Sequence, residues 1–108
     1  MTSEPTTRIF KLVALADYQP GAVVSRQITH AEAGNVTLFA FDQGQELSEH
    51  SAPYEALLQI LEGKAEVRLS GSSYPLCAGE AIILPARAPH AVRAMERCKM
   101  LLTMIRSA

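Results

Sequence analysis

The sequence has little of what marks several common classes of protein. It contains no tryptophan and only two cysteines, Cys77 and Cys98, which form no CxxC pair. We expect both to remain reduced thiols and to pack as small buried apolar groups, as unpaired cysteines in a reducing compartment usually do. A reactive thiol is the alternative for Cys98, because Arg97 and Lys99 would lower its pKa if the sulfur were exposed.

Clustered positive charge and long apolar runs are also lacking. The formal net charge is -1, and the 10 basic residues are scattered along the chain, so no surface is indicated that would match a nucleic-acid backbone. No apolar run approaches the roughly 18 residues that a membrane-spanning helix needs. Residues 1–7 lack the basic start and apolar stretch of a secretory signal. We therefore expect a cytoplasmic protein with a small-molecule ligand, no nucleic acid and no membrane as partners.

The chain does have enough apolar residues for one core. Its 108 residues, 48% of them apolar, suit one domain and are too few for two ordinary cores. Residues 1–7 show no periodic pattern and are expected to form a flexible tail. Residues 8–108 are expected to form a single domain.

Short strands separated by turn residues dominate that domain. Residues 64–69 alternate strictly between apolar and charged side chains, the pattern of a strand with one buried face. Gly34 and Asn35 indicate a hairpin turn between two strand-forming runs. At most a short helical turn is expected at 14–18 or 53–58. The expected strands are 23–30, 36–41, 64–69, 74–77, 81–84, 90–94 and 100–105, which predicts an all-β sandwich or barrel.

Two glycine-anchored segments, 44–63 and 79–90, carry a resemblance to a known family. The matching positions are Gly44, His50, Gly63, Gly79, Pro85 and His90. Their spacing resembles the two motifs of the cupin superfamily over about residues 36–105. The resemblance implies a cupin double-stranded β-helix, which is a jelly-roll barrel. We read Gly63 and Gly79 as turn glycines with positive φ.

The departures from the motifs concern the metal site. The resemblance implies a shell of three histidines and one carboxylate around a divalent metal in full members of the family. Here Ala52 and Ala56 stand where the second histidine and the glutamate would be, and Arg87 replaces a motif glycine. His50 and His90 alone would bind a divalent transition metal weakly and with little selectivity.

Other carboxylates are candidates to replace the missing ligand. Glu49 and Glu55 each lie one residue from an inward position, so a regular strand turns them to the opposite face. A bulge at Pro53 would turn Glu55 inward. Glu46 and Asp42 are expected nearer the rim of the barrel.

The residues expected on the inner surface suggest an apolar pocket with two imidazoles. They are His50, Ala52, Ala56, Leu58, His90, Val92 and Met104, with Ile60 beside them. The alanines favour an open space, although a barrel filled by its own side chains fits the same pattern. His30 is expected to be exposed. Arg87 is expected to be a solvated loop charge or, alternatively, a clamp for a ligand carboxylate.

Three functions are compatible with this pocket. The first is a small-molecule-binding module in which His50 and His90 orient one polar group of a partly apolar ligand. The second is a metal-dependent enzyme of the dioxygenase, isomerase or decarboxylase type, with the metal on His50 and His90. The third is a structural role with a vestigial pocket. A homodimer is expected in each case, because apolar strands are available for pairing.

Overall fold

The computed structural model describes residues 7–106. The expected tail, apart from Thr7, and the last two residues lie outside the described residues. A short 3-10 turn, η1 (Leu12–Ala14), precedes the strands. The strands are β1 (Val23–Ala31), β2 (Gly34–Phe41), β3 (Glu46–His50), β4 (Tyr54–Glu62), β5 (Lys64–Leu69), β6 (Ser72–Cys77), β7 (Ala81–Leu84), β8 (His90–Ala94) and β9 (Cys98–Arg106).

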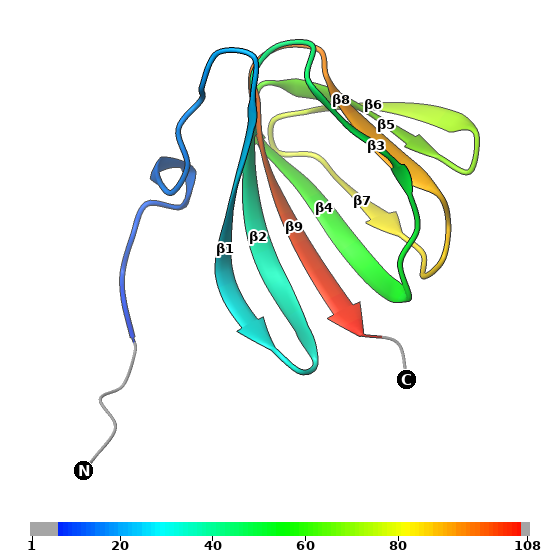
Figure 1. The fold of residues 1–108 in the computed structure, drawn as a ribbon, viewed down its shortest axis with the longest axis horizontal. Helices are drawn as coiled ribbons and strands as arrows, with labels where there is room; N and C mark the ends of the chain where they lie inside the picture. Colours follow the sequence, from blue (N-terminus) through cyan, green and yellow to red (C-terminus); the bar gives the residue numbers. More distant parts are fainter. Residues whose placement is uncertain (1–6, 107–108) are drawn as a thin grey trace.

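The strands form two antiparallel sheets that face each other (Figure 1). The larger sheet has the order β1-β2-β9-β4-β7 and the smaller has the order β3-β8-β5-β6. Consecutive strands pair in β1–β2 and β5–β6, whereas other neighbours are far apart in the sequence, as in the pairing of β4 with β9 and of β3 with β8. This arrangement confirms the predicted all-β jelly-roll fold.

Most predicted strands form where the sequence placed them. The strands at 64–69, 81–84 and 90–94 have the predicted bounds, and the hairpin turn is shorter than expected, with only Glu32 and Ala33 between β1 and β2. The possible helical turn at 53–58 is wrong. That segment begins β4, because its alternating apolar residues pair with β9 on one side and with β7 on the other. The turn expected at 14–18 forms slightly earlier, as η1.

The main core fills the space between the sheets. Phe41, Leu58, Ile60, Val67 and Met100 are at most 1% exposed, and they come from both sheets. Full burial of a side chain of this size contributes roughly 1.5–3 kcal/mol. The inward-facing side chains of β2, β4, β5 and β9 therefore contribute much of the stability of the fold.

The structure also tests the predictions made for two turn glycines and for the two cysteines. Gly63 and Gly79 have φ values of 81° and 89°, which confirms the prediction of turn glycines. Cys98 is buried, as expected, but Cys77 is exposed. The prediction for Cys77 is wrong because Leu76 takes the inward position of β6, and the pleat turns the next residue to solvent.

The segment before β1 covers part of the outer face of the larger sheet. Leu15, Ala16 and Tyr18 belong to a second apolar cluster with Leu38 and Leu101 of the sheet. Two cations lie over the Tyr18 ring, Lys99 at 5.0 Å and Arg97 at 5.4 Å from its centroid. The Tyr18 hydroxyl donates a hydrogen bond to the Glu62 carboxylate. These contacts fix the N-terminal segment to the sheet.

Strands β2 and β9 approach each other closely at the hairpin end. Gly34 pairs with Ile105, and a Cβ atom at Gly34 would overlap the backbone carbonyl oxygen of Met104. Only glycine fits this position without moving the backbone of β9.

Within residues 7–106, the structure contains no helix of the length and apolarity required to cross a membrane.

Candidate functional site

Two histidines meet at one end of the barrel. His50 ends β3, His90 begins β8, and the two residues are paired across the strands after an irregularity between Leu47 and His50. Their ring centroids are 4.4 Å apart and the rings are inclined at 63°, an edge-to-face arrangement. Residues 40 positions apart in the sequence thus present one pair of imidazoles.

Backbone carbonyls set the tautomer of both rings. His50 Nδ1 lies 2.8 Å from the Ser48 carbonyl oxygen, and His90 Nδ1 lies 3.1 Å from that of Ala88. A carbonyl oxygen only accepts, so each Nδ1 carries the hydrogen that it donates. In the neutral rings, each Nε2 therefore keeps a lone pair for a ligand donor or a metal.

A cavity of about 160 Å³ opens beside the histidines. His50 is exposed and His90 is half-buried, whereas the deeper walls are apolar and largely buried. The lining residues come from both sheets and are Phe39, Leu47, His50, Leu58, Leu84, His90, Val92, Met100, Leu102 and Met104. The two imidazoles are thus the polar groups at the mouth of an apolar hollow.

The structure brings five of the seven sequence-predicted pocket residues together. His50, Leu58, His90, Val92 and Met104 line the cavity. Ala52 and Ala56 are not among the lining residues, and Ile60 is buried in the core.

The short side chains of the two alanines explain their positions. Ala56 is 4% exposed and lies between Leu84 and Met104, its partners on β7 and β9. These longer neighbours form the wall in its place. Ala52 lies in the loop after β3, where its carbonyl oxygen accepts a hydrogen bond from the Arg87 backbone at 2.8 Å.

Sequence reasoning missed half of the cavity lining. The missed residues are Phe39, Leu47, Leu84, Met100 and Leu102. The sequence did contain a signal for two of them, because alternate residues of a strand share a face, and Met100 and Leu102 therefore lie on the same face of β9 as Met104. Phe39 pairs with Met100, but this cross-strand neighbour cannot be read from a local pattern.

No carboxylate replaces the missing motif ligand in the described part of the chain. Glu49 and Glu55 are exposed, and Glu55 lies on the face of β4 opposite to Ala56. Asp42 instead accepts hydrogen bonds from the Gly21 backbone at 2.7 Å and from Arg97 at 2.9 Å. The hydrogen bond from Gly21, followed by that from Arg97, lowers the pKa of the Asp42 carboxyl below its usual value.

The donor set does not fit a resident metal of the family type. Among residues 7–106, no three or more His, Cys, Asp or Glu residues gather where they could hold an ion. Two imidazoles without a carboxylate provide few ligands and no compensating negative charge.

Arg87 has a backbone role at this end of the barrel. Its φ is 68°, a conformation that favours glycine, and glycine is what the resembled motif places there. Its side chain is exposed and is not among the residues that line the cavity. His30 is exposed on β1, as predicted, at a position outside the cavity lining.

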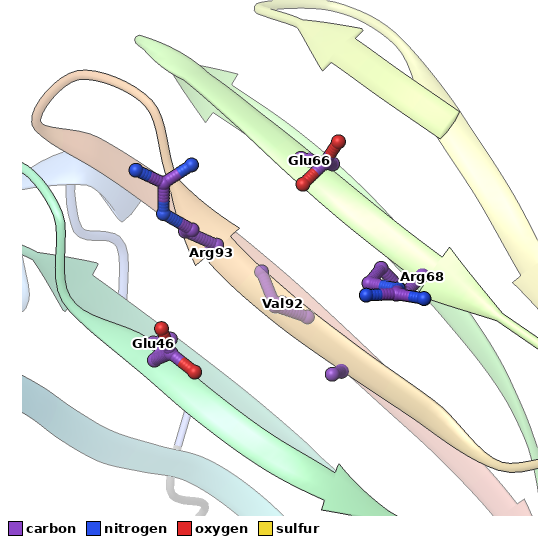
Figure 2. A pocket seen from close by; sticks show the side chains of 6 residues that line it. Glu46, Glu66, Arg68, Val92 and Arg93 are labelled. Carbon is purple, nitrogen blue, oxygen red and sulfur yellow. The ribbon is translucent and has the colours of Figure 1, made fainter. Parts of the chain in front are cut away.

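A second hollow of about 160 Å³ lies on the opposite face of β8 and is charged (Figure 2). Arg93 pairs with Glu46 of β3 on one side and with Glu66 of β5 on the other. Arg68 pairs with Ala91, whose short side chain leaves the depression. Glu46, one of the candidate replacement ligands, thus belongs to this outer surface.

Comparisons with known proteins agree with this fold. A protein of unknown function from Streptococcus pyogenes, SPY1581, is 31% identical, with 94% of this chain and 89% of that chain covered and a TM-score of 0.88. The Cupin 2 conserved barrel domain protein from Leptotrichia buccalis is 34% identical over 90% of this chain and 47% of its own, with a TM-score of 0.87.

One curated relative also matches. The polyketide synthase CurC of Streptomyces cyaneus is 34% identical over 64 residues, which are 58% of this chain and 42% of that protein. The chain therefore spans less than half the length of this relative. The family model described as "Cupin domain" matches residues 37–105. The chain belongs to the cupin-domain family.

Proposed function

We propose that this cupin binds a small, mostly apolar molecule that carries one hydrogen-bond donor. The observation that carries the proposal is the pairing of two free Nε2 acceptors, at His50 and His90, with an apolar cavity directly beside them. A few convergent polar groups on an apolar hollow are the usual composition of a small-molecule site.

The volume limits the size of the ligand. An apolar protein cavity of about 150 Å³ accommodates benzene, and this cavity has about 160 Å³. Typical drug-sized sites begin at about 300 Å³. A molecule with one ring, or an aliphatic group of similar volume, fits this space.

The mouth of the cavity selects the polar end of the ligand. Because both Nδ1 atoms donate to backbone carbonyls, the neutral imidazoles accept rather than donate at Nε2. A hydroxyl group supplies the matching donor. We therefore favour a phenol or a comparable cyclic alcohol, with its ring among Phe39, Leu58 and Met100.

Calorimetric titration with phenol and with toluene tests this function. The two probes fill the same volume, but only phenol donates a hydrogen bond. One hydrogen bond contributes about 1 kcal/mol, so phenol is expected to bind about five- to tenfold more tightly. This preference should disappear in His50→Ala and His90→Ala.

His30→Ala is the matched control, because His30 is an exposed histidine outside the cavity lining. It should retain the preference for phenol. Failure of the wild-type protein to bind either probe would overturn the proposal.

The second candidate is the metal-dependent enzyme, with the metal on His50 and His90. The two free Nε2 atoms favour it, whereas the absence of a third donor among the described residues opposes it. Metal analysis of protein purified without chelator, before and after addition of Zn²⁺ or Fe²⁺, tests this function. A ratio near one metal per chain that falls in His50→Ala would support it, and a ratio near zero throughout would exclude it.

A further inference from the structure

Strands β3 and β8 have unequal numbers of residues at the mouth of the cavity. Leu47 lies opposite Val92, and His50 lies opposite His90. Between these two pairs β3 has two residues, whereas β8 has one. Two residues opposite one form a β-bulge, which bends its strand and interrupts the ladder of hydrogen bonds.

The residues of the bulge are Ser48 and Glu49, and the residue opposite them is Ala91. Within the described chain, neither Ser48 nor Glu49 has a partner in the register of β3 with β8. Both are exposed. Bulges often occur beside functional sites, where they redirect a side chain, and this bulge lies directly between the two residue pairs that line the cavity.

The bulge decides which side chain after it points inward. Successive side chains of a regular strand point to opposite faces, and Leu47 points inward, where it lines the cavity. A regular continuation of β3 would therefore turn Glu49 inward and His50 outward. In the structure His50 lines the cavity and Glu49 does not. The extra residue thus places an imidazole, rather than a carboxylate, at the mouth.

The two strands are regular up to this point. Glu46 and Arg93 are paired and border the charged depression on the outer face (Figure 2). Their neighbours Leu47 and Val92 are paired and line the cavity on the inner face. The departure from the regular pattern therefore begins at Ser48.

Contacts on both sides hold the extra residue in place. Before the bulge, Leu47 packs against the main core. After it, the carbonyl oxygen of Ala52 accepts a hydrogen bond from the Arg87 backbone at 2.8 Å. Within the bulge, the Ser48 carbonyl oxygen accepts the hydrogen bond from His50 Nδ1, also at 2.8 Å. The bulge therefore supplies the group that fixes the tautomer of the ring that it turns inward.

We propose that the Ser48–Glu49 bulge is the positioning element of this site and sets the class of ligand that the cavity accepts. By turning His50 into the mouth, it pairs two neutral acceptors and keeps the Glu49 carboxylate outside. A carboxylate beside His90 would favour a cation, because a charge-assisted hydrogen bond is about twice as strong as a neutral one. The statement about ligand class rests on the proposed function, whereas the statement about the direction of His50 does not.

Disulfide trapping tests the direction of His50 without any ligand. In a Cys77→Ser background, His50→Cys with His90→Cys places two cysteines directly opposite each other, at a separation that a disulfide spans. Glu49→Cys with His90→Cys is the matched pair, because residue 49 points to the opposite face. Thiol counting after oxidation should show the first pair closing at least tenfold faster than the second. Equal or faster closure of the second pair would overturn the proposal.

Two single-residue deletions test whether the bulge sets the ligand class. Each removes the bulge and shortens β3 by one residue, but they leave different side chains opposite His90. Deletion of Glu49 leaves His50 there, so phenol should still bind more tightly than toluene. Deletion of His50 leaves Glu49 there, so this preference should be lost. Benzylamine, a cation with one ring, should then bind about tenfold more tightly than it binds to His50→Ala.

His50→Ala is the control for the second deletion, because it removes the same imidazole but keeps the bulge and leaves Glu49 outside. A purely structural role would give equal losses in both deletions, so equal behaviour toward phenol and benzylamine would overturn the proposal. The cysteine pairs keep the full length of β3 and decide the direction of His50 even if a deletion variant does not fold. A wild-type chain that binds neither phenol nor toluene, while the first cysteine pair closes faster, would contradict the proposed function and support the positioning by the bulge.

Discussion

The two faces of β8 carry hollows of the same volume and opposite chemistry. On the inner face, His90 and Val92 line an apolar cavity of about 160 Å³. On the outer face, Ala91 and Arg93 lie in a charged depression, also of about 160 Å³. The inner hollow is lined by residues of both sheets, which face each other in Figure 1, whereas the outer one lies among the charged side chains shown in Figure 2. Volume alone therefore does not distinguish the two hollows, whereas the chemistry of their walls does.

The largest expected effect comes from placing the same charge on each face. Val92 is 2% exposed, so Val92→Asp buries a carboxylate without a partner and should lower the free energy of unfolding by about 4 kcal/mol. Ala91→Asp places the carboxylate opposite Arg68 and should change it by no more than about 0.5 kcal/mol. Urea denaturation measures both. Equal losses would contradict the difference between the faces.

A cavity-enlarging substitution should have the next largest effect. Leu58 is fully buried and lines the cavity, so Leu58→Ala should cost about 3 kcal/mol of stability. The enlarged cavity should also admit naphthalene, which the wild-type cavity excludes. Leu57→Ala, on the outer face of the same strand, should cost less and leave the probe preference unchanged. Calorimetric titration with naphthalene measures the admission of the larger probe. Equal affinities of Leu58→Ala and Leu57→Ala for naphthalene would contradict the prediction.

High pH should lower the free energy of unfolding through the buried Cys98. Burial, followed by the charges of Glu62 and Glu96, raises the pKa of the Cys98 thiol from 9.0 to about 11. The unfolded chain loses this proton at lower pH than the folded chain does. The contribution of the protonated thiol to the free energy of unfolding is therefore fully present below pH 9 and is lost as the pH rises from 9 to 11. The expected loss is about 2 to 3 kcal/mol.

Thermal unfolding from pH 8 to 11 measures this loss, and Cys98→Ala should reduce it. Part of the slope should remain, because burial and the hydrogen bond to Glu62 also raise the pKa of Tyr18. Cys77→Ala is the control, since Cys77 is exposed. An identical pH dependence in Cys98→Ala and the wild-type chain would rule out the role of this thiol.

The smallest effect is expected in the charged depression. Arg93 is exposed and forms no ion pair within residues 7–106, in contrast to Arg97, which pairs with Asp42. Arg93→Gln should therefore change stability by less than about 0.5 kcal/mol and leave phenol binding unchanged. A clear loss of phenol affinity would show that the outer hollow contributes to the site.

Local sequence patterns were sufficient for seven of the strands, whereas β3 and β4 were not predicted. The alternation at 64–69 reflects a pleat with one buried face, which depends only on residues close in the sequence. The two histidines were identified by the resemblance of the segments around Gly44, His50 and His90 to the cupin motifs.

The remaining cavity wall depends on which strands meet. Phe39 and Leu84 line the cavity because β2 and β7 flank the central pair β9 and β4, and no local pattern specifies that order. The alanines at 52 and 56 were predicted to open the cavity, but longer neighbours on other strands fill the space in front of Ala56. The direction of each Nδ1 proton likewise depends on backbone carbonyls two residues away in a specific turn geometry.

The close approach of β2 and β9 at Gly34 has a consequence for how this site can change. Met104 lines the cavity with its side chain, and its carbonyl oxygen lies where a side chain at Gly34 would begin. Any substitution at Gly34 must push β9 aside and so displace the cavity wall. Variants at Gly34 should therefore be tested for a changed preference between phenol and toluene as well as for a loss of stability.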